Sequence, residues 1–187
     1  MRKTTSGFTI VELLIVIVVI GILAAITIVA YNGIQQRSNN AAVIDAASKS
    51  LRMLQAYVAA SGTPPATSVA CITMASGCST TGSAYSANTT FNSNMATIGT
   101  MPQRIPMKGP DHYGIIYYYN ASRVVSGSPT PIAVLYWLDG FAQQCGIPNL
   151  LADPNAATTT ISTNAYTAPN DTSTGKTLCA PSLPGLY

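Results

Sequence analysis

The residue with the clearest chemical consequence is Glu12, the only glutamate in the chain. It lies inside an apolar run from Gly7 to Ile26 that reads GFTIVELLIVIVVIGILAAI. An isolated charge in lipid costs about 3 kcal/mol on insertion scales, so such a group is usually paired with another charge and functional. Glu12 is therefore either tolerated because it lies near the start of a helix, where the helix dipole favours a carboxylate, or it marks a functional position.

Enzymatic and metal chemistry have weak support in the sequence. His112 follows Asp111 and hydroxyl residues are abundant, but neither the GxSxG motif nor a P-loop occurs. Asp153 and Asp171 are too few to predict a calcium site, and the cysteines lack CxxC spacing for zinc. We expect no catalytic residues, no metal and no cofactor.

Four cysteines follow the apolar run, which suits an oxidising exterior: Cys71, Cys78, Cys145 and Cys179. Three pairings are possible. We favour Cys71 with Cys78, which closes a small loop, and Cys145 with Cys179, which staples the carboxyl-terminal region.

Charge is sparse in this 187-residue chain, in which 8% of residues are charged and the net charge is +3. Arg2 and Lys3 precede the apolar run, and the seven other basic residues are scattered. The sequence therefore offers no electrostatic footprint for nucleic acid.

Residues 13–30 carry no charge and one hydroxyl, on Thr27, and the run from Phe8 is long enough to cross a bilayer as a helix. The basic residues before it predict a cytoplasmic Met1 and an external chain after Tyr31. A removable signal peptide and a plain signal anchor remain as alternatives.

The stretch SGFTIVELLIVIVVIGILAAI resembles the amino-terminal signature of type IV pilins and pseudopilins. The resemblance is carried by the basic leader, the Gly7–Phe8 pair, Thr9, Glu12 and the apolar run that follows. Pilins commonly have a proline before the Ala-Tyr pair, where this chain has Val29, so a proline kink is in doubt here.

The resemblance implies that a membrane peptidase cuts after Gly7 and that Phe8 becomes the N-methylated amino terminus. Glu12 of one copy would then pair with the Phe8 amine of a neighbouring copy in a helical bundle. Gly21 and Ala25 form a small-xxx-small pair that would let neighbouring helices approach.

Helical periodicity continues beyond Tyr31, and Gly62 followed by two prolines predicts a stop, so we expect a helix from about Phe8 to Ser61. Its polar face would carry Asp45, Lys49 and Arg52. Its predicted apolar face is Ile34, Ala41, Ile44, Ala47, Leu51, Leu54 and Val58. A membrane helix, a linker at YNGIQQRSNN and a separate second helix form the alternative.

The remainder predicts an antiparallel sheet. Residues 63–107 are uncharged as far as Arg104 and poorly periodic, which indicates a long surface connection or disorder. Strand patterns occur at 112–120 and 131–139, with a short strand at 124–125 and an edge strand near 158–162. The predicted inner face comprises Ile115, Tyr117, Val134 and Tyr136.

These observations predict an α+β, pilin-like fold in which a long amino-terminal helix spans the membrane with its first half and packs with its second half on an antiparallel sheet. The expected parts are a leader (1–7), an assembly helix (8–31), an amphipathic helix (32–61) and an external head (62–187). We expect a type IV pilus subunit that assembles with its own copies through Phe8, Glu12 and Gly21. Its other expected partners are a prepilin peptidase and methyltransferase, the pilus assembly machinery and, before assembly, the membrane.

Two other functions remain open. A pseudopilin of a secretion or DNA-uptake machine would share the signature. A signal-anchored surface binding module would need neither a cut after Gly7 nor Glu12.

Overall fold

The computed structural model describes residues 7–72, 77–80, 83–102, 105, 112–125, 128–147, 151–152, 161–162, 165–166, 170–171 and 175–183. The chain divides into two compact units, Met1–Ser38 and Asn39–Tyr187. Helix α1 contributes to both units, and each unit is described by itself.

Helix α1 (Ile10–Ser61) is continuous, so the alternative of two helices joined by a linker is wrong. It begins two residues after the predicted start at Phe8 and passes through Gly21, Val29 and Gly33 without a break in helical structure. It ends at Ser61, as predicted, and is followed by Gly62, whose φ of 70° is left-handed and whose N–H donates to the Val58 carbonyl at 2.8 Å.

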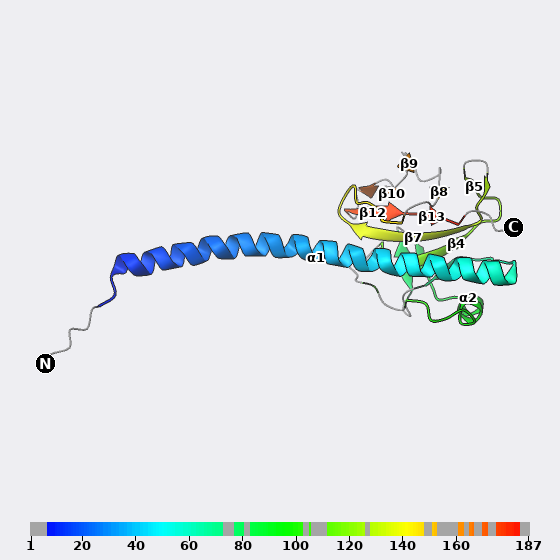
Figure 1. Ribbon diagram of the computed structural model, residues 1–187, viewed down its shortest axis with the longest axis horizontal. Helices are drawn as coiled ribbons and strands as arrows, with labels where there is room; N and C mark the ends of the chain where they lie inside the picture. Colours follow the sequence, from blue (N-terminus) through cyan, green and yellow to red (C-terminus); the bar gives the residue numbers. More distant parts are fainter. Residues whose placement is uncertain are drawn as a thin grey trace. The chain divides into compact units, whose positions relative to one another are not determined.

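The second unit contains an antiparallel sheet, and residues 39–61 of α1 lie along one of its faces (Figure 1). Its main spatial order is β1 (Ala70–Cys71), β4 (Ile115–Tyr119), β7 (Ile132–Asp139), β12 (Lys176–Cys179) and β11 (Asn170–Asp171). Strand β13 (Pro181–Ser182) pairs with β7 and with β8 (Leu151–Ala152). Three separate hairpins are β2 (Cys78–Thr80) with β3 (Ser83–Tyr85), β5 (Val124–Val125) with β6 (Ser128–Pro129), and β9 (Ile161–Ser162) with β10 (Ala165–Tyr166).

The predicted inner face of the sheet is confirmed. In the β4–β7 ladder Ile115 lies opposite Tyr136 and Tyr117 opposite Val134, and all four side chains are 0% exposed in the core that includes α1. The alternate residues of these strands point to the other face, where Ile116 and Trp137 cluster with the disulfide-bonded Cys71 and Cys78.

The predicted apolar face of α1 needs a correction. The buried residues of the helix are Asn40, Val43, Ala46, Ala47, Ser50, Leu51, Leu54 and Val58. Ile34 is exposed because it precedes the first helical residue buried by the head, and Ala41 is exposed because it lies on the opposite side of the helix from Val43 and Ala47. The apolar pattern alone had missed two polar members of the buried face, Asn40 and Ser50.

The prediction of a surface connection at 63–107 was wrong in one part. Helix α2 (Thr89–Met95) lies there and buries Phe91 and Met95 in the core. Asn88 caps it by accepting a hydrogen bond from the Phe91 N–H at 2.9 Å, and the Phe91 ring lies 4.8 Å from that of Tyr117. A seven-residue helix among Asn, Ser and Thr residues has too little periodicity to be predicted.

The carboxyl-terminal strands also differ from the prediction. The strand near 158–162 consists of Ile161–Ser162 in the described residues and pairs with β10, so it is not an edge of the main sheet. Residues 158–160 lie outside the described part. The strand β12, beside β7, was missed because it begins with a lysine. Lys176 is buried, and its ammonium donates to the His112 carbonyl at 2.8 Å.

Candidate functional site

The amino-terminal site begins in non-helical backbone. Gly7, Phe8 and Thr9 precede the first helical residue, Ile10, and the Phe8 side chain is 78% exposed. The peptide bond between Gly7 and Phe8 therefore lies outside the helix. Residues 1–6 of the predicted leader lie outside the described part of the chain.

Thr9 and Glu12 form a reciprocal hydrogen-bonded cap at the start of α1. The Thr9 N–H and hydroxyl both donate to Glu12 Oε2 at 2.8 Å, and the Glu12 N–H donates to the Thr9 hydroxyl at 3.2 Å. This arrangement is a capping box, in which a carboxylate three residues into the helix reaches back to its start. The cap also places the negative charge at the positive end of the helix dipole.

The role of Thr9 was not recognised in the sequence, although Thr-x-x-Glu before an apolar run is the signature of a capping box. Of the predicted assembly residues, Phe8 lies just before α1 and Glu12 lies in its first turn. Gly21 lies more than two helical turns further along, where a methyl group added at its Cα would meet no atom within 4 Å. The structure thus places Gly21 on an open helix surface.

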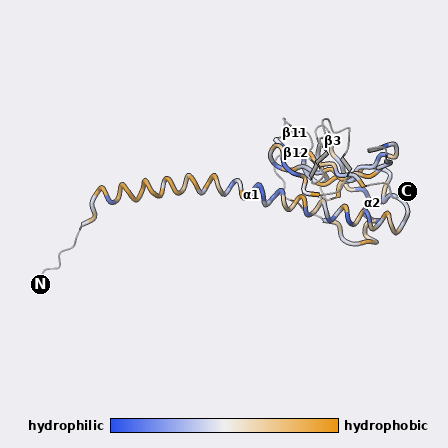
Figure 2. Tube along the Cα trace, turned by 45° about the horizontal axis from the view of Figure 1, so that its top comes forward, coloured by the Kyte–Doolittle hydropathy of each residue, from blue (hydrophilic) through white to orange (hydrophobic). Residues whose placement is uncertain are grey.

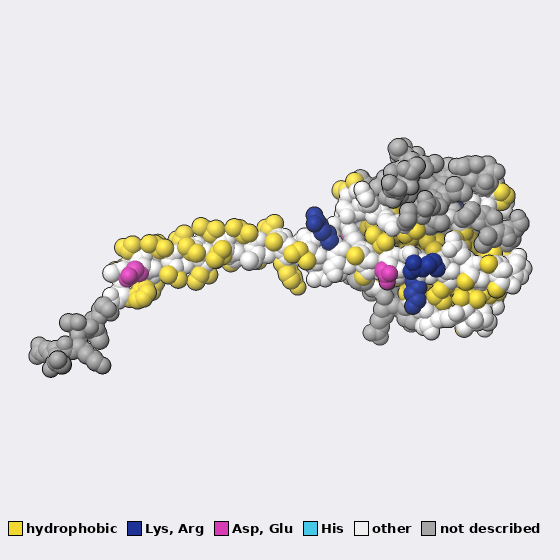
Figure 3. All heavy atoms as spheres, in the orientation of Figure 1, with side chains coloured by type: hydrophobic (Ala, Val, Ile, Leu, Met, Phe, Trp, Pro, Cys, Tyr) yellow, Lys and Arg dark blue, Asp and Glu magenta, His cyan; other side chains and the backbone are white. Residues whose placement is uncertain are grey.

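The first unit exposes an apolar surface between Phe8 and Ile34. Large hydrophobic side chains from Phe8 to Ile34 are exposed. Figure 2 shows that the first part of α1 is mostly hydrophobic by residue hydropathy, and Figure 3 shows hydrophobic side chains along its visible surface. Among the described helices, α1 is long and apolar enough to cross a membrane, and its most apolar window contains no buried residue. Such an extended apolar surface indicates a membrane or protein partner.

Two polar side chains of the apolar stretch, Glu12 and Thr27, form hydrogen bonds with residues three positions away. The Thr27 hydroxyl donates to the Ala24 carbonyl at 2.9 Å, and Glu12 is held by Thr9. Such local hydrogen bonds lower the cost of placing a polar side chain in hydrocarbon, because no water is available there.

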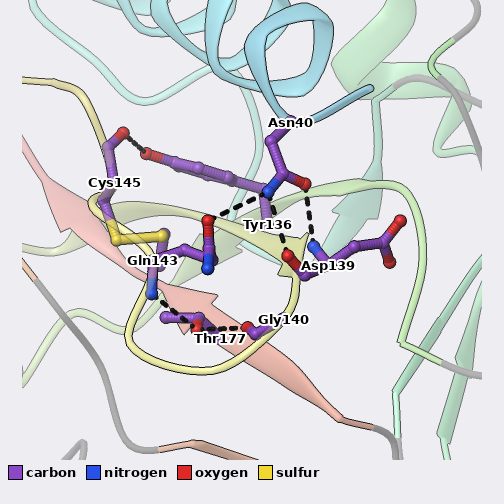
Figure 4. The surroundings of a disulfide bond; sticks show 8 residues. Asn40, Tyr136, Asp139, Gly140, Gln143, Cys145 and Thr177 are labelled. Carbon is purple, nitrogen blue, oxygen red and sulfur yellow. Dashed lines mark hydrogen bonds between the residues drawn. A yellow bond between two sulfur atoms is a disulfide. The ribbon is translucent and has the colours of Figure 1, made fainter. Parts of the chain in front are cut away.

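Two disulfides close loops in the second unit, and they join the pairs favoured from the sequence. Cys71 is bonded to Cys78 and Cys145 to Cys179. Beside the second bond, the buried Tyr136 hydroxyl donates to the Cys145 carbonyl at 2.6 Å (Figure 4). Burial raises the pKa of the Tyr136 phenol above its ordinary value.

His112 lies at the edge of the buried sheet. Its ring makes an edge contact with the Trp137 ring at 5.5 Å, and its carbonyl accepts the Lys176 ammonium. His112 is 6% exposed and is therefore packed within the second unit. The described residues contain no group of three or more histidine, cysteine or acidic side chains arranged to hold a metal. Asp111 and Asp153 lie outside the described part of the chain.

Comparison with known families gives a match at the amino terminus. Residues 2–28 match the family described as the prokaryotic N-terminal methylation motif, which is the leader signature of type IV prepilins and pseudopilins. The resemblance drawn from Gly7, Phe8, Thr9 and Glu12 is confirmed over this stretch, and it indicates a type IV pilin-like or pseudopilin protein. Searches of curated proteins and of solved structures find no match to the chain.

Proposed function

We propose that this chain is a prepilin whose processed form is a structural subunit of a type IV pilus. The observation that carries the proposal is the methylation motif at residues 2–28 on a capped helix whose apolar surface is exposed. A helix of this kind needs lipid or neighbouring helices to cover it, and a filament core supplies the latter. The disulfide-closed head suits an oxidising exterior.

Cleavage of the leader creates the positively charged group that would pair with Glu12. Hydrolysis of the peptide bond between Gly7 and Phe8 releases the leader and leaves a free amine on Phe8, which is then N-methylated. That amine and the Glu12 carboxylate carry opposite charges at the same end of each copy. An uncut chain has no amine at this position and so cannot form the pair.

The local geometry supports pairing between copies. Thr9 holds Glu12 Oε2, whereas Oε1 accepts no hydrogen bond from the described residues. The second oxygen is therefore available to the Phe8 amine of a neighbouring copy, while the first keeps the side chain in a defined rotamer. An incoming subunit satisfies both charges at once, which favours one arrangement of the helices over many.

The proposal implies two locations for the protein. Before assembly it spans the cytoplasmic membrane once with its amino terminus inside, and after assembly it lies in a surface fibre that supports attachment or motility. The partners are then a prepilin peptidase and methyltransferase, the assembly machinery and other copies of the chain.

The first test is intact-mass measurement and amino-terminal sequencing of protein from filaments sheared off cells that express the chain at its native level. We expect a chain that begins at N-methylated Phe8, with a mass lowered by the four hydrogens of two disulfides. A processed chain that never enters the sheared fraction would favour a pseudopilin of a secretion or DNA-uptake machine. An uncut Met1 terminus would favour a signal-anchored binding module and remove the proposed pairing.

A further inference from the structure

The side chains that α1 buries against the sheet are mostly small and apolar. Five of the eight buried helix residues are alanine, valine or serine between Val43 and Val58. Apolar burial is non-directional, so small apolar side chains discriminate weakly between neighbouring positions of the helix on the sheet. Some directional contact is needed to select one register.

Asn40 makes such a contact at the first buried position of α1. Its side chain is 7% exposed and forms a two-point hydrogen bond with the backbone of Asp139, at the end of β7 (Figure 4). The Asn40 Nδ2 donates to the Asp139 carbonyl at 3.0 Å, and the Asp139 N–H donates to Asn40 Oδ1 at 2.8 Å. Nδ2 also lies 3.4 Å from Gln143 Oε1.

The backbone that receives Asn40 is itself held in place. Thr177 Oγ1 donates to the Gly140 carbonyl at 2.7 Å and accepts the Gln143 N–H at 3.1 Å. The Cys145–Cys179 disulfide then closes the loop onto β12. A fixed acceptor and donor on the sheet give the Asn40 amide one position at which both of its bonds form.

We propose that Asn40 is the positioning residue that sets the register of α1 on the head. A shift of one helical turn, about 5.4 Å, would bury the Asn40 amide and the Asp139 peptide without their partners. The consequence for assembly rests on the proposed function, because copies that polymerise through the first part of α1 must all carry the head at the same register.

Ser50 provides a matched contrast. It is also a buried polar residue on the same stripe, but its hydroxyl donates to the Ala46 carbonyl at 2.8 Å, within the helix. Both partners of that bond belong to α1, so the bond forms equally well at any position of the helix on the sheet.

The test measures the distance between two spin labels on the unassembled full chain in detergent, with the native disulfides intact. One label is placed at the exposed Ala56 on α1 and the other at the exposed Ser122, in the turn after β4. The variants are Asn40→Leu, which removes the hydrogen bonds but adds apolar surface, and the control Ser50→Ala.

We expect one narrow distance for the parent chain and for Ser50→Ala, and a broadened or second distance shifted by up to about 5.4 Å for Asn40→Leu. A merely stabilising role for Asn40 would lower the unfolding midpoint and leave the single distance unchanged, and that result would overturn the proposal. If Asn40→Leu does not fold, the same spin-label distance is measured in Asn40→Asp, and that measurement tests the positioning role. It keeps the acceptor for the Asp139 N–H and loses the donor, so we expect broadening there as well.

Because the protein is unassembled in this experiment, its result does not depend on whether the chain polymerises. A failed filament assay with a shifted distance in Asn40→Leu would leave the positioning role standing and count only against the pilus subunit.

Discussion

The two units use the same helix under opposite conditions. In the first unit Leu14 is 53% exposed and is surrounded by equally apolar neighbours, whereas in the second unit Leu54 is 0% exposed beneath the sheet. Both segments are regular α-helix, so backbone geometry does not distinguish them. The difference lies in what covers the side chains. The head supplies its own cover, and the amino-terminal segment must obtain one from lipid or from other copies.

The largest losses of filament should come from substitutions at the Glu12 charge and at the Gly7 cleavage position, in the amino-terminal segment. We expect Gly7→Ala and Glu12→Ala to leave membrane-inserted protein and to reduce sheared filaments by at least about 100-fold, since a lost charge partner in lipid costs about 3 kcal/mol. Immunoblots of the sheared and membrane fractions measure both outcomes.

Glu12→Gln separates the two roles of this side chain, because glutamine can form the capping box but carries no charge. We expect Glu12→Gln to fail in assembly like Glu12→Ala, and Thr9→Ala to reduce filaments far less. Abundant normal filaments from Glu12→Gln would show that capping, and not pairing with an amine, is the role of this residue.

In the covered unit the Cys145–Cys179 disulfide should matter most. It closes a loop of sequence separation 34, and the Cys71–Cys78 bond one of 7. From loop entropy we expect replacement of the first pair by alanine to lower the free energy of unfolding by about 4 kcal/mol, and of the second pair by about 2.5 kcal/mol. Urea unfolding followed by fluorescence of Trp137, the only tryptophan, measures each loss. Equal losses for the two pairs would contradict the loop-length argument.

A leucine pair compares the units directly. We expect Leu54→Ala to lower the free energy of unfolding of the head by about 3 kcal/mol, because it opens a cavity in the core. We expect Leu14→Ala to change it by less than about 0.5 kcal/mol, because the side chain has no cover to lose. The same Trp137 measurement serves both variants, and a comparable loss in Leu14→Ala would mean that the first unit stabilises the head.

The smallest effect is a pH dependence of the head. Burial raises the pKa of the Tyr136 phenol, so the folded state keeps its proton while an unfolded tyrosine loses it near pH 10. The stabilisation is complete below about pH 10 and decreases as the pH rises above that value, by at most about 1.4 kcal/mol per pH unit. Tyr136→Phe should flatten this decline in urea unfolding measured from pH 8 to 11. An unchanged decline in the variant would assign it to other groups.

Local signals predicted much of the fold and part of the site. The long apolar run and the Gly62 stop gave α1, and alternation placed Ile115, Tyr117, Val134 and Tyr136 on one face, because these patterns are properties of short stretches of chain. The same reasoning missed α2 and β12. A seven-residue helix rich in Asn and Thr has little periodicity, and a strand that begins with Lys176 does not resemble a buried strand.

The sequence by itself determined the amino-terminal site, since Gly7, Phe8, Thr9 and Glu12 lie within six residues and a helix cap needs no distant partner. Only the tertiary structure decided which residues of α1 the head buries and how they are held. Asn40 is recognisable as a positioning residue only because its side-chain amide hydrogen-bonds the Asp139 peptide group, 99 residues away in the sequence. The burial of a polar side chain depends on a partner that folding supplies, and no local pattern records where that partner will be.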